Sequence, residues 1–292
     1  MSAPLPSSFA DAQEEISGAL DQLLSVAATT GTPDPVLAAM RYTLLAPSKR
    51  VRAVLVHFAA DVCGDRARAM PAAAAVECIH ASSLILDDLP SMDNAPRRRG
   101  RPSAHIAHGE AVAILAAFGL LNLAYGHLAS AYPAPLAARV ASLYSEAVGL
   151  DGLIAGQAED VLATDAVIDF DTLERIHRRK TGVLFSAAAQ AGAVSAGASD
   201  AAIASLTSYA KNLGLAFQIV DDLLDVVGTE ADTGKAVRAD ARKTTFVSFS
   251  GVDGARELAH ELCATAERAL DPFGRRADPL RALARFVAGR RA

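Results

Sequence analysis

Residues 72–105 read AAAAVECIHASSLILDDLPSMDNAPRRRGRPSAH and contain the most informative pattern in the chain. It begins as an alanine-rich apolar run with helical spacing and ends in three aspartates, Asp87, Asp88 and Asp93. Three carboxylates near the C-terminal end of a helix repel one another and oppose the helix dipole, so they are costly unless a cation lies beside them. The stretch therefore predicts an apolar helix that ends in a cation site.

A second aspartate cluster follows another apolar run, in GLAFQIVDDLLD at residues 214–225. Asp221 and Asp225 are four residues apart and share one helix face, with Asp222 between them and Gln218 one turn earlier. Magnesium prefers oxygen ligands and is usually held by one or two carboxylates plus substrate phosphates. Two facing clusters predict a diphosphate held between them through bridging magnesium. Either cluster alone is also consistent with a solvated helix end.

Cationic residues surround both clusters. Diphosphate recognition uses guanidinium forks and ammonium groups, and both types occur here. Each cation taken singly fits an exposed surface residue, but their placement beside the aspartates favours diphosphate binding. They are Lys49, Arg50, Arg52, Arg97, Arg98, Arg99, Arg101, Lys180, Lys235 and Lys243, with His80 two turns before Asp87.

The composition excludes several classes of protein. The 292 residues are 51% hydrophobic and 21% charged, which excludes a disordered chain, and the net charge of −5 without a long basic run argues against nucleic-acid binding. Three widely spaced cysteines, Cys63, Cys78 and Cys263, exclude a disulfide framework and a cysteine zinc site. The first basic residue is Arg41, which is unlike a secretory signal. We expect a cytoplasmic protein.

Helical spacing dominates the chain, and no run of alternating β-branched residues is convincing. We predict an all-α fold in one domain, residues 1–292. Residues 111–138 contain no charged side chain and are long enough to span a bilayer, but glycine, prolines and polar residues interrupt them. We expect no membrane span, and instead a helix buried at the centre of the domain or in a dimer interface. The predicted helices cover residues 9–26, 35–45, 51–63, 71–88, 110–129, 135–163, 170–191, 201–226, 255–270 and 278–288.

The sequence resembles the trans-polyprenyl diphosphate synthases, and among them the bacterial carotenoid-pathway geranylgeranyl diphosphate synthases. The resemblance covers residues 49–251 and rests on both aspartate segments together with GLIAGQAED, RRKTG, TGK and DARKTTFV. It implies a single polyprenyl synthase domain, an isoprenoid-synthase-type helical bundle with a central cavity. Such an enzyme joins isopentenyl diphosphate to dimethylallyl, geranyl or farnesyl diphosphate. Three magnesium ions would make the allylic diphosphate a good leaving group, and the double bond of isopentenyl diphosphate would attack the resulting carbocation. A homodimer is implied as well.

The resemblance also implies a role for each matching residue. Asp87, Asp93, Asp221 and Asp225 would ligate magnesium, supported by Asp88 and Asp222. The allylic diphosphate would contact Arg98, Gln157, Asp160, Lys180, Thr181, Gln218, Lys235 and Lys243. Lys49, Arg52, His80 and Arg99 would form the pocket for isopentenyl diphosphate.

The chain departs from the family pattern at Pro47-Ser48, Ala53 and Ala236, none of which has an assigned role. The resemblance implies that product length depends on Ser82 and Ser83, five and four residues before Asp87. Small residues there leave room for a longer chain and favour geranylgeranyl over farnesyl diphosphate, although they also suit a plain helix contact. Phe118 on the next helix is expected to be able to shorten the cavity again.

Two other functions fit parts of the pattern. A terpene cyclase shares the first aspartate motif but usually carries an Asn/Ser/Glu second motif in place of Asp221, Asp222 and Asp225. A catalytically silent partner subunit of another synthase tends to lose aspartates or pocket cations, whereas this chain retains them. A farnesyl diphosphate synthase is the nearest alternative.

Overall fold

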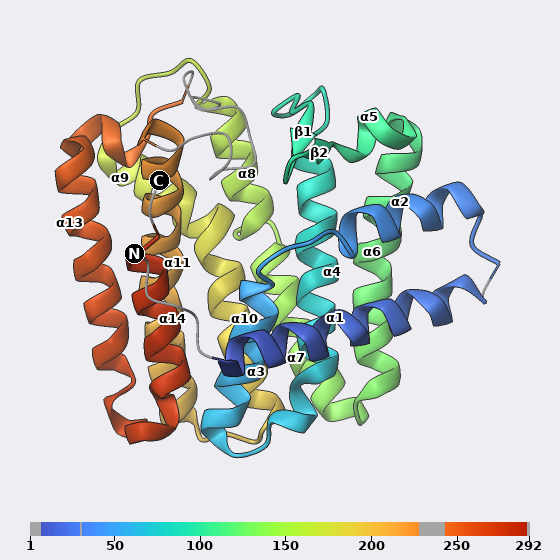
Figure 1. Ribbon diagram of the computed structural model, residues 1–292, viewed down its shortest axis with the longest axis horizontal. Helices are drawn as coiled ribbons and strands as arrows, with labels where there is room; N and C mark the ends of the chain where they lie inside the picture. Colours follow the sequence, from blue (N-terminus) through green and yellow to red (C-terminus); the bar gives the residue numbers. More distant parts are fainter. Residues whose placement is uncertain (1–6, 30, 228–242, 291–292) are drawn as a thin grey trace.

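Helices form nearly all the regular structure of the computed structural model, which describes residues 7–29, 31–227 and 243–290 (Figure 1). The all-α prediction is confirmed. The elements in chain order are α1 (Ser7–Ala28), α2 (Asp34–Leu44), α3 (Val51–Cys63), η1 (Arg66–Ala69), α4 (Met70–Asp87), β1 (Arg97–Arg98), β2 (Arg101–Pro102), α5 (Ala104–His108), α6 (Glu110–Ala131), α7 (Ala134–Val148), α8 (Leu153–Leu162), α9 (Phe170–His177), η2 (Arg178–Gly182), α10 (Val183–Ser195), α11 (Asp200–Val227), α13 (Phe246–Ala269), η3 (Asp271–Ala277) and α14 (Asp278–Ala288).

The centre of the bundle is built from helices that are apolar on every side. α4 and α10 are alanine-rich, and most of their residues are buried against α3, α6 and α11. A helix that is hydrophobic all round is stable only when it is surrounded by other helices. Gly192 shows how close this packing is, because a Cβ there would lie 2.2 Å from the carbonyl oxygen of Val56 on α3. One hydrophobic cluster runs from Phe9 to Val287.

The outer helices enclose this centre. α11, α13 and α14 pack together on one side and α2, α5 and α6 lie on the other, while α1 crosses the front (Figure 1). α4 ends at the same end of the bundle as the β1–β2 hairpin and α8 (Figure 1). The first aspartate cluster is therefore delivered to one end of the molecule.

Several predicted boundaries are wrong. The helix predicted at 135–163 is two helices, α7 and α8, separated at Gly149 and Gly152. A Cβ at Gly152 would lie 2.2 Å from the carbonyl oxygen of Ala147, so the chain turns there by a close backbone approach that periodicity does not reveal. The helix predicted at 170–191 contains a π-helical turn, η2, and α13 begins at Phe246 instead of residue 255.

Among the residues that the structure describes, two helical stretches are long and apolar enough to cross a membrane by length and composition alone. In Arg66–Asp87, 67% of the most apolar window is buried in the bundle, whereas in Glu110–Ala131 only 33% is buried. α6, which carries no charged residue after Glu110, is thus not enclosed within the single chain. Of the two environments expected for it, the dimer interface remains a prediction.

Candidate active site

The loop after α4 folds back onto the end of that helix. The backbone N–H of Asp93 donates to the carbonyl of Asp87 at 3.0 Å, and that of Ala95 donates to the carbonyl of Asp88 at 3.2 Å. These bonds satisfy carbonyls that a helix C-terminus leaves without an intrahelical partner. They also bring the three aspartates of the first cluster together, as their spacing predicted.

The β1–β2 hairpin holds an arginine against this cluster. Arg99 and Gly100 both have positive φ, at 52° and 75°, which suits a tight two-residue hairpin turn. Arg98 on β1 donates from Nε to both carboxylate oxygens of Asp88, at 2.9 and 3.0 Å, and its Nη2 lies 3.6 Å from Asp87. Asp88 is buried, and this fork-like pairing compensates its charge.

Asp160 on α8 joins two lysines to the first cluster. Lys180 Nζ and Lys243 Nζ each lie 2.8 Å from Asp160 Oδ2. Lys180 also reaches Asp87 Oδ1 at 3.3 Å, and Lys243 reaches Asp93 Oδ1 at 2.9 Å. Two ammonium groups and three carboxylates thus alternate along one network, which we call the lysine bridge.

The lysine bridge shifts the pKa values of its members. Burial alone raises the pKa of Asp160, but Lys180 and Lys243 outweigh it and hold that pKa below its usual range. Burial lowers the pKa of both lysines, yet their carboxylate partners leave each pKa above its ordinary value. All three groups are therefore charged at neutral pH.

Close packing between α8 and η2 fixes the position of Lys180. A Cβ at Gly156 would lie 2.3 Å from the backbone nitrogen of Lys180, so only glycine permits this approach. On the same helix, Gln157 Nε2 donates to Asp87 Oδ1 at 2.8 Å. A π-helical turn such as η2 is frequent at functional sites, and here it turns Lys180 toward the aspartates.

The second cluster is tied to the same turn. Thr181 Oγ1 donates to Gln218 Oε1 at 3.0 Å, and Gln218 Nε2 donates to Asp222 Oδ1 at 2.9 Å. Asp222 is buried and also accepts from the backbone N–H of Phe246 at 3.1 Å, which anchors the start of α13. Its position suits a supporting role behind Asp221.

Asp221 and Asp225 both lie on α11, four residues apart and so on one helix face, as predicted, and both are half-buried. Arg290, near the C-terminus, donates from Nη1 to Asp221 Oδ1 at 2.6 Å and stacks over the ring of Phe217 at 4.7 Å. Sequence inspection did not single out Arg290, because its partner lies 69 positions away.

The structure brings together part of the cationic pocket expected for isopentenyl diphosphate. Arg52 Nη1 and His80 Nε2 lie 3.1 Å apart, and the guanidinium of Arg52 stacks on Phe185 at 4.8 Å. Burial lowers the pKa of Arg52 to about 10 and, together with Arg52 and Arg99, lowers the pKa of His80 well below 6.5. His80 is therefore neutral at pH 7 and can accept from Arg52. Lys49 is exposed.

Sequence inspection listed Arg50 among the cations but missed two other buried groups, Glu77 and His177. Arg50 pairs with Glu77 at 3.3 Å, and Glu77 also accepts from the backbone N–H of Ala53, so this pair ties the start of α3 to α4. His177 is buried with both ring nitrogens lacking a hydrogen-bond partner among the described residues, and its ring lies 5.3 Å from that of Phe246. Burial lowers the pKa of His177 to about 4.

The residues expected to set product length have different environments. Ser82 is buried, and its hydroxyl donates to the carbonyl of Ala117 on α6 at 2.8 Å, which matches the plain helix-contact alternative. Ser83 is half-buried and bonds within its own helix, to the carbonyl of His80. Phe118 is 62% exposed on α6, because Ala117 and its neighbours occupy the face toward α4. The expectation that Phe118 narrows a cavity stays a prediction.

The chemistry of the aspartates fits magnesium. The described residues contain no group of three or more His, Cys, Asp or Glu side chains placed to hold a metal ion without further ligands. Magnesium commonly takes only one or two carboxylates and completes its shell with phosphate oxygens and water. The carboxylates of Asp87, Asp93, Asp221 and Asp225 supply the hard oxygen donors that such an ion requires. Lys235 lies outside the described residues.

The fold is a helical bundle with two aspartate clusters, and lysines bridge one of these clusters. This combination is typical of enzymes that bind diphosphate substrates. The polyprenyl synthetase family model matches residues 33–266. The chain is 40% identical to a chloroplastic geranylgeranyl pyrophosphate synthase of Capsicum annuum, over 94% of this chain and 76% of that protein.

Solved structures agree with this match. An FPP/GFPP synthase from Zymomonas mobilis superposes with a TM-score of 0.82 at 34% identity, covering 94% of this chain and 96% of that one. A geranyltransferase from Helicobacter pylori, solved with magnesium and isoprenyl diphosphate, gives a TM-score of 0.80 at 27% identity, covering 98% and 95%. The chain belongs to the polyprenyl synthetase family, and it is a trans-prenyltransferase.

Proposed function

We propose that the protein condenses isopentenyl diphosphate with allylic diphosphates, head to tail, and releases geranylgeranyl diphosphate. The lysine bridge is the observation that carries this proposal. It places two positively charged ammonium groups among the carboxylates of the first cluster, within reach of a diphosphate that would bind there. Positioning and charge neutralisation of this kind supply most of the catalysis in reactions in which a diphosphate is the leaving group.

The residues of the site divide the work. Lys180 and Lys243 neutralise oxygens of the allylic diphosphate, while Asp160 keeps both ammonium groups in place. Thr181 and Gln218 orient the same group from η2 and α11. The allylic carbon–oxygen bond breaks, pyrophosphate leaves, and the double bond of isopentenyl diphosphate forms the new carbon–carbon bond. The proton lost from the product passes to the departing pyrophosphate.

Magnesium supports this chemistry when it is bound, because it polarises the diphosphate oxygens as a Lewis acid. Asp87 and Asp93 from the first cluster and Asp221 and Asp225 from the second would hold it, and three ions are proposed. The cations that now bind Asp87, Asp93 and Asp221 would have to move toward phosphate oxygens. Isopentenyl diphosphate would bind beside Arg52, His80, Arg99 and Lys49 without metal.

The proposed product rests on two observations. Ser83 offers no bulk near the end of α4, and a relative at 40% identity carries the name geranylgeranyl pyrophosphate synthase. A farnesyl product is the alternative, since an FPP/GFPP synthase is among the structural neighbours. A non-catalytic partner subunit is a more distant alternative.

We also propose a cytoplasmic homodimer without a membrane span. The support for a dimer is α6, where Leu115 and Phe118 are exposed large apolar side chains on a helix only partly covered by the chain. All three cysteines are free, which suits a reducing compartment. Light scattering of the purified protein tests the dimer, and Phe118→Glu should shift it toward monomer.

The test of the activity is a condensation assay with magnesium, labelled isopentenyl diphosphate and farnesyl diphosphate, followed by dephosphorylation and chromatography. A geranylgeraniol peak that disappears with chelator, and with Asp87→Ala, is the expected result. Farnesol made only from shorter starters would keep the enzyme class and replace the product. The absence of any condensation product with all three allylic starters would overturn the proposal.

A further inference from the structure

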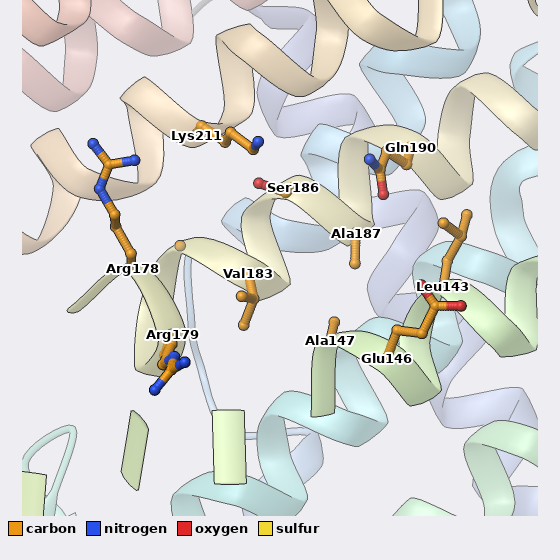
Figure 2. Close-up of a pocket in the computed structure, with 11 residues that line it drawn as sticks. Leu143, Glu146, Ala147, Arg178, Arg179, Val183, Ser186, Ala187, Gln190 and Lys211 are labelled. Atoms are coloured by element: carbon orange, nitrogen blue, oxygen red, sulfur yellow. The ribbon is translucent and has the colours of Figure 1, made fainter. Parts of the chain in front are cut away.

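A cavity lies beside η2, on residues other than those of the active site. It has a volume of about 340 Å³, which falls within the roughly 300–1,000 Å³ of small-molecule sites. Segments of α7, η2, α10 and α11 border it (Figure 2). None of the residues assigned above to diphosphate or metal binding is among those that line it.

The cavity has a cationic end and an apolar wall. Arg178 and Lys211 lie at one side of the view in Figure 2, Leu143 and Glu146 at the other, and Val183 and Ala187 between them. Lys211 is exposed and forms no ion pair with any residue in the described ranges. Arg178 uses Nε and Nη2 to bind Glu174, and an arginine carries five N–H donors, so it retains donors for an oxyanion. An elongated molecule with an anionic head and a short apolar chain matches this distribution.

The cavity and the lysine bridge share one structural element, the π-helical turn η2. Arg178 and Arg179 border it from the same five-residue π-helical turn that carries Lys180 and Thr181 toward the aspartates. Arg179 also binds Glu159 on α8 at 2.7 Å, one residue before Asp160. A ligand that draws Arg178 into the cavity therefore acts on the segment that positions Lys180.

We propose that this cavity binds a short-chain isoprenoid phosphate and that its occupancy changes the affinity of the catalytic site for the allylic diphosphate. The phosphate lies against Lys211 and Arg178, and the chain lies along Val183 and Ala187 toward Leu143. The choice of an isoprenoid rests on the proposed function, since such molecules are the substrates and products of that reaction. The existence of an amphiphilic anion site rests on the cavity alone.

Calorimetry with 3,7-dimethyloctyl phosphate tests the binding. This saturated monoester has no allylic bond to ionise, so it cannot react. We expect saturable binding to the full-length protein, weakened at least tenfold by Lys211→Glu and unchanged by Arg256→Glu, an exposed charge reversal on α13. Inorganic phosphate and 3,7-dimethyloctanol, the head and the chain alone, should each bind at least tenfold more weakly. Equal binding to the wild type and Lys211→Glu, or equal binding of inorganic phosphate, would overturn the site.

Kinetics test the coupling separately. The probe should change KM for the allylic diphosphate at least twofold in the wild type and not in Lys211→Glu, whose parameters without probe should match the wild type. Simple competition at the catalytic site would persist in Lys211→Glu and would refute the coupling. Calorimetry needs no turnover, so a protein that binds the probe but makes no product would overturn the proposed function and leave the cavity assignment standing.

Discussion

Replacing Asp160 with asparagine removes one negative charge from the centre of the lysine bridge and almost nothing else. Both Lys180 and Lys243 bind the same oxygen, Oδ2, at 2.8 Å. The side-chain carbonyl of asparagine can accept the same two hydrogen bonds, so the variant keeps the shape of the site. It separates the charge of Asp160 from its geometry.

The loss of folding free energy in Asp160→Asn follows from the change in these two hydrogen bonds. The ammonium donors stay charged in the variant, so each bond remains charge-assisted and loses only the attraction between opposite charges. Within the about 1.5–3 kcal/mol of a hydrogen bond to a charged group, we take this loss as about 1 kcal/mol for each bond. Lys180 and Lys243 retain Asp87 and Asp93 as partners, which keeps the loss below the ~3–5 kcal/mol of a broken buried ion pair. We expect Asp160→Asn to lower the free energy of unfolding by about 2 kcal/mol at pH 7.

This difference should depend on pH in one direction. The fold lowers the pKa of Asp160, so its stabilising contribution is fully present above the unfolded pKa and is lost as pH falls through the folded pKa. The gap between wild type and variant should stay constant above about pH 5 and shrink below about pH 4. The free energy of unfolding in urea, measured across this range, gives the comparison.

Asp151→Asn is the matched control. Asp151 also binds an arginine, Arg179, at 2.6 Å, but its side chain is 93% exposed, so the change should cost less than about 0.5 kcal/mol. The reasoning is refuted if Asp160→Asn matches the wild type at pH 7, or if the difference is as large at pH 3 as at pH 7.

Four further results are expected. Ser83→Phe should shift the product from twenty to fifteen carbons by chromatography, whereas Ser82→Phe should mainly destabilise the fold, by about 1–3 kcal/mol, because the ring overpacks the contact with α6. Since the pKa of His80 lies well below 6.5, His80→Gln should raise KM for isopentenyl diphosphate while leaving the shape of the pH–rate profile between about pH 6 and 8 unchanged. Arg290→Ala should lower the magnesium concentration for half-maximal rate by about two- to fivefold, because the arginine competes for Asp221, and an unchanged magnesium titration would contradict this. A chelator should abolish turnover but shift the melting temperature of the substrate-free protein by no more than about 2 °C, since cations of the chain already compensate the aspartates, and a larger fall would oppose that account.

The sequence predicted the helices that carry the two aspartate clusters because each is a long apolar run with a charged end. Their spacing correctly placed Asp221 and Asp225 on one helix face, and the loop of the first cluster does bring Asp87 and Asp93 together. The predicted ligand roles of these residues stay predictions. The single helix predicted at 135–163 failed because a close backbone contact at Gly152 leaves no trace in apolar periodicity.

The partners of the aspartates could not be predicted in the same way. Lys180 lies 93 positions from Asp87, and Lys243 lies 150 positions from Asp93. Such pairings depend on how helices cross, and a pattern read along one chain contains no crossing angles. Phe118 illustrates the same limit: its position on a helix next to α4 was correct, but the face it occupies follows from the packing of Ala117 against α4.

The paired acidic and basic groups of the site have two roles. They stabilise the empty site, and they supply the ligands for a diphosphate and its metal ions. Three aspartates at a helix end repel one another. Arg98, Lys180 and Lys243 offset that repulsion while no diphosphate is bound. The same cations are the groups that an incoming diphosphate needs, and the carboxylates are the groups that its metal ions need. When a metal–diphosphate complex binds, each lysine–aspartate pair would be replaced by two new pairs, one between the lysine and the diphosphate and one between the aspartate and a metal ion. No charge would be left unpaired. That exchange avoids the desolvation cost of an isolated buried charge, and it explains why the lysines lie among the aspartates instead of opposite them.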